Sequence, residues 1–132
     1  MNFPLSPVLV VDDEKNMRRS LETVLKDEGY AAQVAESAEE ALELIAREDF
    51  FMVITDVRLG GMSGYELLLQ VRADPALGET PFIMVTAESK TDNVIAARKA
   101  GVNNYIVKPF NAQTLRTKIE AAFAEAAESA PA

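Results

Sequence analysis

Residues 8–14 read Val8-Leu9-Val10-Val11-Asp12-Asp13-Glu14, an unbroken apolar run that leads directly into acidic residues. A run of Val and Leu without polar alternation is typical of a strand buried on both faces, as in a parallel sheet. The acidic residues stand where such a strand ends. The stretch therefore predicts a central parallel strand with carboxylates at its carboxyl end.

Similar apolar runs recur along the chain, and segments of helical periodicity separate them. The predicted strands are Val8 to Val11, Ala31 to Ala35, Phe51 to Thr55, Phe82 to Val85 and Tyr105 to Val107. The first three predicted helices are a segment around Met17, Leu21 and Leu25 that stops at Gly29, Ala38 to Ala46 behind an N-cap Ser37, and Gly64 to Arg72. The last two are Thr91 to Ala100 and a helix capped by Asn111, with a buried stripe of Leu115, Ile119 and Phe123.

Five βα units with short connections predict an α/β fold with a parallel sheet and helices on both of its faces. We expect a flavodoxin-like (βα)5 doubly wound sheet with strand order 2-1-3-4-5. This order is adopted from known sheets of that kind, because the sequence pattern alone does not determine it. We expect one domain over residues 8–125, between an N-terminal tail at 1–7 and an Ala/Glu-rich tail at 126–132.

Composition excludes several classes of site. The 132 residues contain no Cys and no His, which removes disulfides, thiolate or imidazole metal sites and Ser-His-Asp catalysis. The formal charge of −8 disfavours direct nucleic-acid binding, and the basic pairs Arg18-Arg19 and Arg98-Lys99 are interpreted as solvated helix surface. With no bilayer-length apolar run and no signal peptide, we expect a cytoplasmic protein without membrane insertion.

Three aspartates are the candidate ligand site. In an open parallel sheet, ligands bind beyond the carboxyl ends of the strands, where the strand order switches, here between the first and third strands. Asp12 and Asp13 end the first strand and Asp56 ends the third. Because carboxylates that converge repel one another, they call for a hard divalent cation, and Mg²⁺ suits oxygen ligands. The alternative is that Asp12 and Asp13 only cap the first helix and Asp56 only starts a turn.

Two further polar residues end strands at the same rim. Thr86 ends the fourth strand and Lys108 follows the fifth. A phosphoryl group on Asp56 would place charge on three oxygens, which Mg²⁺, the Lys108 ammonium and the Thr86 hydroxyl would stabilise. Thr86 or Lys108 alone would be interpreted as an ordinary surface residue. The prediction therefore rests on the expectation that both lie at the same edge of the sheet as the aspartates.

At this point the sequence resembles the response-regulator receiver family of two-component signalling, and its last two units are most similar to single-domain chemotaxis receivers. The stretches that carry the resemblance are residues 8–14, Ile54-Thr55-Asp56, Pro81-Phe82-Ile83-Met84-Val85-Thr86-Ala87-Glu88 and Tyr105-Ile106-Val107-Lys108-Pro109-Phe110. They occur in the family's order and cover nearly the whole chain.

The resemblance implies roles for the metal-site residues. Asp13 would hold Mg²⁺ directly, Asp12 largely through water, and the Arg58 backbone carbonyl would be a further ligand. Asp56 would be both metal ligand and phosphoacceptor. The loop after Asp56 departs from the family in having Gly60 where Pro is usual, and two adjacent glycines widen its accessible conformations.

The resemblance also implies switch and lifetime residues. Thr86 would move toward the phosphoryl group and Tyr105 would turn inward behind it. Arg58 and Glu88 would flank the phosphoryl group and influence its lifetime. We hypothesise that Arg58 pairs with Glu88 or covers the acyl phosphate, against the alternative of a solvated Arg.

Because no second domain follows in this sequence, we expect output through contact with a protein target. The expected partner face comprises Thr91, Val94, Arg98, Tyr105, Val107 and Lys118. The phosphodonor would be a histidine kinase or a histidine phosphotransfer protein, and the chain would act as a signalling receiver, monomeric or weakly homodimeric, and not as an enzyme with its own substrate. Two alternatives stay open: a phosphorelay intermediate, and a Mg²⁺-dependent phosphohydrolase, which Val57 and Arg58 disfavour because such enzymes place an acid there.

Overall fold

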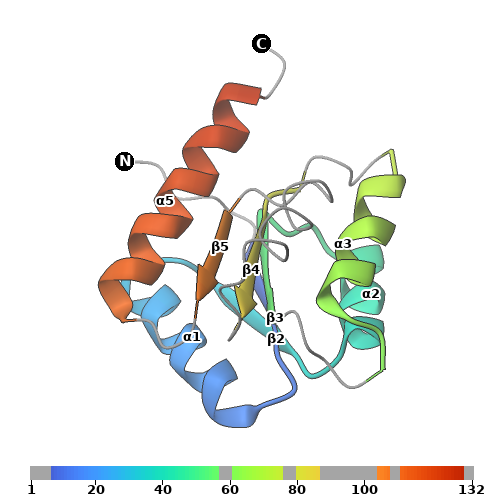
Figure 1. Ribbon diagram of the computed structural model, residues 1–132, viewed down its shortest axis with the longest axis horizontal. Helices are drawn as coiled ribbons and strands as arrows, with labels where there is room; N and C mark the ends of the chain where they lie inside the picture. The colour runs from blue at the N-terminus through green and yellow to red at the C-terminus, as the bar shows by residue number, and fades with distance from the viewer. Residues whose placement is uncertain (1–6, 57–60, 76–79, 87–103, 108–110, 130–132) are drawn as a thin grey trace.

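The computed structural model describes residues 7–56, 61–75, 80–86, 104–107 and 111–129, and all structural statements below refer to these residues. They form a central sheet flanked by a helical layer on each side (Figure 1). The predicted helix at residues 91–100 lies outside the described residues.

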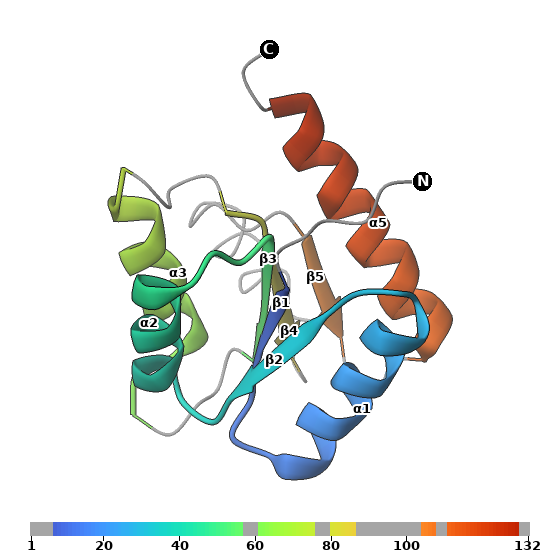
Figure 2. The same ribbon diagram turned by 180° about the vertical axis from the view of Figure 1, so that it is seen from behind.

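The sheet is fully parallel and its strands lie in the order β2-β1-β3-β4-β5, which confirms the expected doubly wound fold. The strands are β1 Val8–Val11, β2 Ala32–Ala35, β3 Met52–Asp56, β4 Phe82–Thr86 and β5 Asn104–Val107. Each bound agrees with the sequence prediction to within one residue. The edge strand β5 faces the viewer in Figure 1, and the opposite edge strand β2 faces the viewer in Figure 2.

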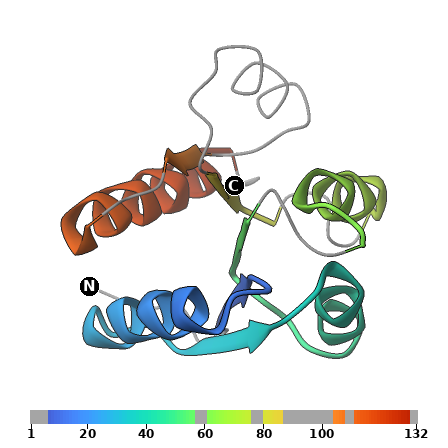
Figure 3. The same cartoon turned by 60° about the horizontal axis from the view of Figure 1, so that its bottom comes forward.

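The described helices are α1 Lys15–Asp27, α2 Ala38–Arg47, α3 Gly64–Ala73 and α5 Ala112–Ser129. Figure 3 shows α1 and α5 together on one face of the sheet and α2 and α3 together on the other. None of these helices, in the part of the chain described, has the length and apolar character to cross a membrane.

The central strands divide their side chains between two cores, as the unbroken apolar runs predicted. Val8 and Val10 of β1 belong to the cluster under α1 and α5, and Leu9 and Val11 to the cluster under α2 and α3. All four are 0% exposed. Full burial of such a side chain stabilises the fold by roughly 1.5–3 kcal/mol, so the strand that carries Asp12 is held firmly from both faces.

The helix ends follow the predicted stop and cap residues. Gly29, after α1, adopts the left-handed φ of 92° that glycine accommodates without strain. The Ser37 side chain accepts a hydrogen bond from the Glu40 amide at the start of α2, and the Asn111 side chain accepts one of 2.7 Å from the Thr114 amide at the start of α5.

The last helix is longer than expected. The sequence predicted fraying after Phe123 and a tail from residue 126, whereas α5 runs to Ser129. Ala and Glu, which dominate this end of the chain, are strong helix formers, and that preference accounts for the extension. The domain boundary at residue 125 itself stays a prediction.

An arginine fixes the end of α3 to the amino end of β4. The Nη1 atom of Arg72 donates a 2.5 Å hydrogen bond to the Thr80 carbonyl, and the guanidinium lies 5.3 Å from the centroid of the Phe82 ring. Since β4 begins at Phe82, this contact lies at the edge of the sheet opposite Asp12 and Asp56.

Candidate functional site

The strand register brings Asp12 and Asp56 to neighbouring positions. Val11, the last residue of β1, pairs with Thr55 of β3, and Asp12 and Asp56 are the residues that directly follow this pair. Neighbouring strands lie about 4.8 Å apart, which makes the backbones of the two aspartates adjacent. Both lie at the carboxyl edge of the sheet, toward which the arrowheads point in Figure 1.

The three predicted carboxylates differ in exposure. Asp12 is 1% exposed, Asp56 is half-buried and Asp13 is exposed. Asp12 Oδ1 accepts a 2.9 Å hydrogen bond from the Glu14 amide, and the Asp12 amide donates to the Ala35 carbonyl at 3.1 Å. The Asp12 side chain therefore stabilises the turn after β1.

The capping alternative is wrong for the first helix. The N-cap residue of α1 is Glu14, and the side chain of this residue makes no capping hydrogen bond. Asp12 instead closes a tight turn two residues ahead of that position, an arrangement for which Asp is well suited. The turn orients the chain between β1 and α1 and leaves the Asp13 side chain at the surface.

The donor set at this edge consists of oxygen atoms, which fits a hard cation such as Mg²⁺. Within the described residues, however, no three Asp, Glu, His or Cys side chains lie close enough together to hold a metal ion. The strand register brings Asp12 and Asp56 to one edge of the sheet.

Arg18 is not the solvated surface residue that the sequence predicted. Its side chain is only 12% exposed, and Nη1 donates a 2.8 Å hydrogen bond to the Asp12 backbone carbonyl. Nη2 lies 3.4 Å from Glu36 Oε1. Arg18 is three and seven residues before the buried Leu21 and Leu25, so helical periodicity puts all three on one face. That spacing was the signal that could have placed it.

The end of the loop after Asp56 is attached to α2. The Met62 amide donates a 3.2 Å hydrogen bond to Glu39 Oε1, and Gly61 beside it has a positive φ of 83°. A side chain at position 61 would be strained by that φ, so Gly61 is required for this turn. Sequence reasoning identified the glycine pair and missed Glu39.

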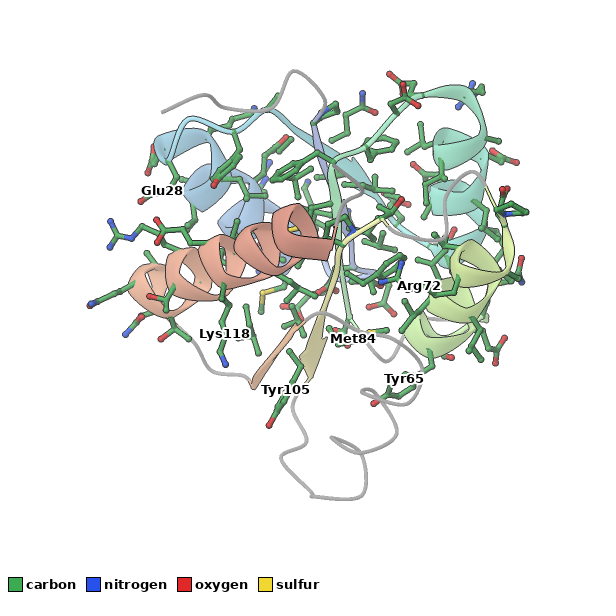
Figure 4. The ribbon with its side chains drawn as sticks, turned by 90° about the horizontal axis from the view of Figure 1, so that it is seen from above. Glu28, Tyr65, Arg72, Met84, Tyr105 and Lys118 are labelled. Atoms are coloured by element: carbon green, nitrogen blue, oxygen red, sulfur yellow. The ribbon has the colours of Figure 1, made fainter. Side chains whose placement is uncertain are left out.

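Tyr105 and Lys118, both predicted on the partner face, are in contact. Lys118 Nζ lies 5.7 Å from the centroid of the Tyr105 ring, a cation–π distance. Figure 4 shows the two labelled side chains next to each other, from β5 and α5. Tyr105 is half-buried and packs against the core under α2 and α3.

The remaining predicted residues are placed only in part. Thr86 is the last residue of β4 and pairs with Val107 of β5, at the carboxyl edge of the sheet. The residues outside the described part of the chain are Arg58, Glu88, Thr91, Val94, Arg98 and Lys108. Their roles stay predictions.

Similarity to known proteins agrees with this geometry. A model of the response regulator receiver domain matches residues 8–120. The chemotaxis proteins CheY-3 of Vibrio cholerae serotype O1 and CheY of Pseudomonas aeruginosa are each 44% identical over 117 residues, which cover 88% of this chain and 90% and 94% of theirs.

Solved structures give the same family. CheY4 of Vibrio cholerae has a TM-score of 0.85 and 30% identity, over 90% of this chain and 99% of that one. The response regulator TrrA of Thermotoga maritima, solved in complex with Mg²⁺-BeF, has a TM-score of 0.79 and 33% identity, over 89% of this chain and 99% of that one. This chain therefore belongs to the response regulator receiver domain family, with a fold like that of the chemotaxis protein CheY.

Proposed function

We propose that this response regulator accepts a phosphoryl group on Asp56 in a Mg²⁺-dependent reaction and signals through contact with a protein target. The observation that carries the proposal is the β1–β3 register, which makes Asp12 and Asp56 neighbours at the carboxyl edge of the sheet. An open parallel sheet binds its ligands at this edge and at this switch in strand order.

The metal site in this proposal consists of Asp12, Asp13, Asp56 and the Arg58 carbonyl. The oxygen-only donor set of the three carboxylates supports Mg²⁺, and so does the structure of the relative TrrA in complex with Mg²⁺-BeF. Mg²⁺ supplies positive charge where phosphoryl oxygens develop negative charge.

The chain's own residues position the reaction. A carboxylate oxygen of Asp56 attacks the phosphorus of a phosphohistidine on a histidine kinase. The new P–O bond forms as the donor's P–N bond breaks, and the histidine nitrogen leaves with the electron pair. Thr86 and Lys108 would stabilise the transferred oxygens. Arg58 and Glu88 would control how fast water removes the phosphoryl group.

The output face in this proposal combines residues of the sequence segment 91–100 with residues of β5 and α5. It comprises Thr91, Val94, Arg98, Tyr105, Val107 and Lys118. The Tyr105–Lys118 contact supports a shared face because it joins β5 to α5. Phosphorylation must favour one arrangement of this face energetically in order to act as a switch. The setting of the proposal is the cytoplasm, with the chain as a monomer or weak homodimer.

A fluoroberyllate experiment tests the proposal, because fluoroberyllate with Mg²⁺ mimics an aspartyl phosphate. The chain contains no Trp, so thermal unfolding is followed by circular dichroism. We expect Mg²⁺ and fluoroberyllate together to raise the Tm by more than the sum of their separate effects, because the ligand binds only the folded state. Asp56→Asn removes this excess.

The control is Asp49→Asn, which removes the same charge at an exposed position before β3. It keeps the excess stabilisation. The proposal is contradicted if Asp56→Asn keeps the excess as well, or if the wild-type protein shows none.

A further inference from the structure

Arg18 occupies an unusual place for a charged residue. It lies in the first turns of α1, yet its side chain is only 12% exposed. A guanidinium that leaves water needs hydrogen-bond partners, because an unsatisfied buried charge is strongly destabilising. The hydrogen-bond partners of the Arg18 guanidinium therefore indicate the role of this residue.

The partner at the shorter distance is the Asp12 backbone carbonyl, which accepts the 2.8 Å hydrogen bond from Nη1. The second contact, 3.4 Å from Nη2 to Glu36 Oε1, joins a side chain that is 71% exposed, so its strength is small. A hydrogen bond from a charged donor is stronger than a neutral one. The hydrogen bond to Asp12 is therefore the stronger of these two Arg18 contacts.

This contact lies next to the end of the β1–β2 pairing. Val11 pairs with Ala35, and the Asp12 amide donates a 3.1 Å hydrogen bond to the Ala35 carbonyl. The Arg18 side chain contacts the residue that follows each strand, at the Asp12 carbonyl and at Glu36 Oε1. Arg18 thus fixes three segments to one another: the end of β1, the residue after β2 and α1.

The Asp12 carbonyl belongs to the peptide group that links Asp12 to Asp13. A planar peptide with a fixed carbonyl fixes the direction in which the chain leaves Asp12 and enters Asp13. The Glu14 amide holds the Asp12 side chain from the other side of the same turn, at 2.9 Å. The two proposed metal ligands therefore project from a backbone that Arg18 holds in place.

We propose that Arg18 is a positioning residue of the Asp12–Asp13–Asp56 site, which sets its affinity for divalent cations by holding the Asp12–Asp13 peptide and without contacting the ion. The inference rests on the proposed function, because it assumes that these aspartates bind Mg²⁺. Partners one step removed from a metal typically change affinity on the order of tenfold or more.

The test measures Mg²⁺ binding to unphosphorylated protein by calorimetry, together with the Tm in the absence of Mg²⁺. Arg18→Met keeps the length and apolar stem of the side chain and removes its donors. Arg18→Lys keeps the charge and one donor. We expect Arg18→Met to weaken Mg²⁺ binding by about tenfold, and Arg18→Lys to recover part of the loss.

Two matched controls separate positioning from charge and from general stability. Arg19→Met removes the same charge from the exposed neighbouring residue. Arg72→Met removes an arginine that also donates to a backbone carbonyl, but at the opposite edge of the sheet. We expect Arg72→Met to lower the Tm, and both controls to keep the Mg²⁺ dissociation constant within about twofold of wild type, as expected for sites that share no partner with the aspartates.

A second readout follows the rate of phosphorylation by acetyl phosphate against Mg²⁺ concentration. For Arg18→Met we expect the half-saturating Mg²⁺ concentration to rise while the rate at saturating Mg²⁺ stays near that of wild type. A purely structural role would not produce this split.

Two outcomes overturn the inference in different ways. If wild type binds Mg²⁺ and Arg18→Met binds it equally well, or no worse than Arg19→Met or Arg72→Met, Arg18 has only a structural role and the proposed function stands. If wild type shows no Mg²⁺ binding, the proposed function and this inference both fail.

Discussion

At the scale of single residues, the neighbouring Asp12 and Asp13 differ in burial and in their contacts. Asp12 is 1% exposed and holds the turn after β1 through the Glu14 amide, whereas Asp13 is exposed. A substitution at Asp12 therefore disturbs both the turn and the proposed metal site. A substitution at the exposed Asp13 changes the proposed metal site and leaves the turn intact.

The first prediction concerns Asp13→Asn. Because the side chain is exposed, we expect the free energy of unfolding without Mg²⁺ to change by less than about 0.5 kcal/mol. Loss of a direct anionic ligand should weaken Mg²⁺ binding by about a hundredfold, equivalent to ~2.8 kcal/mol. Urea unfolding and calorimetry measure the two quantities.

The control for Asp13→Asn is Glu14→Gln, which removes a negative charge from the next exposed residue. It should reduce Mg²⁺ affinity only through general electrostatics, by about twofold. Equal losses in the two variants would mean that Asp13 is not a ligand.

The Tyr30 hydroxyl makes the free energy of unfolding depend on pH in the alkaline range. Its ring stacks on Phe51 with centroids 5.8 Å apart and an interplanar angle of 11°. Burial raises the pKa of the Tyr30 hydroxyl above its ordinary value of 10.0, and the negative charges of Glu120 and Glu28 raise it further. The folded state thus holds the phenol proton more tightly than the unfolded chain does.

The second prediction follows from the sign of that pKa shift. Below pH 10 both states are protonated and the stabilisation is fully present, and it is lost as the pH rises through the higher pKa of the folded state. Tyr30→Phe should therefore lose less stability than wild type between pH 9 and pH 11, roughly the range around the ordinary Tyr pKa.

Urea unfolding across this pH range measures the effect of Tyr30→Phe. Tyr65→Phe is the companion variant, because burial alone raises the pKa of Tyr65. If wild type and Tyr30→Phe lose stability in parallel, the raised pKa of Tyr30 has no consequence for folding.

At the scale of helices and strands, the cap at the start of α5 has an effect on stability that can be measured. Asn111 Oδ1 accepts from the Thr114 amide at 2.7 Å, and α5 starts at the next residue, Ala112. The helix carries Leu115 and Ile119 into the core, and its Lys118 contacts Tyr105. The cap therefore affects both stability and the proposed output face.

The third prediction is that Asn111→Ala lowers the free energy of unfolding by about 0.5–2 kcal/mol, because one amide at the start of α5 loses its acceptor. Asn111→Asp should match or exceed wild type, since a carboxylate accepts the same bond and interacts well with the helix dipole. Thr117→Ala, at an exposed position inside α5, is the control and should change stability little. A fall equal to that of Asn111→Ala in the control would contradict the capping role.

The described helices and strands could be predicted from the sequence because their signals are local. Apolar runs and periodicity place each strand to within one residue, and Gly29, Ser37 and Asn111 mark helix ends by local hydrogen bonding and backbone freedom. The prediction that the chain frays after Phe123 was wrong, because Ala and Glu, which dominate this segment, favour a helix. The prediction that Arg18 is solvated was wrong, because Arg18 lies on the face of α1 that also carries the buried Leu21 and Leu25.

At the scale of the whole molecule, the strand order could not be obtained from local signals. The order β2-β1-β3-β4-β5 was adopted from known folds, and the structure and the receiver relatives agree with it. Once the order is known, the meeting of Asp12 and Asp56 follows from the register of β1 and β3. Side-chain contacts between segments distant in the chain, such as Glu39 with Met62, have no signal in the sequence alone.

The proposal that Asp56 is the phosphoacceptor of a Mg²⁺-dependent site can be tested by intact mass. The protein is incubated with acetyl phosphate and Mg²⁺, and the mass is compared between wild type, Asp56→Asn and a wild-type sample with excess chelator. We expect an acid-labile gain of one phosphoryl group in wild type with Mg²⁺ and no gain in the other two samples. An equal gain in Asp56→Asn would contradict the assignment of the acceptor, and an equal gain with chelator would contradict the dependence on the metal.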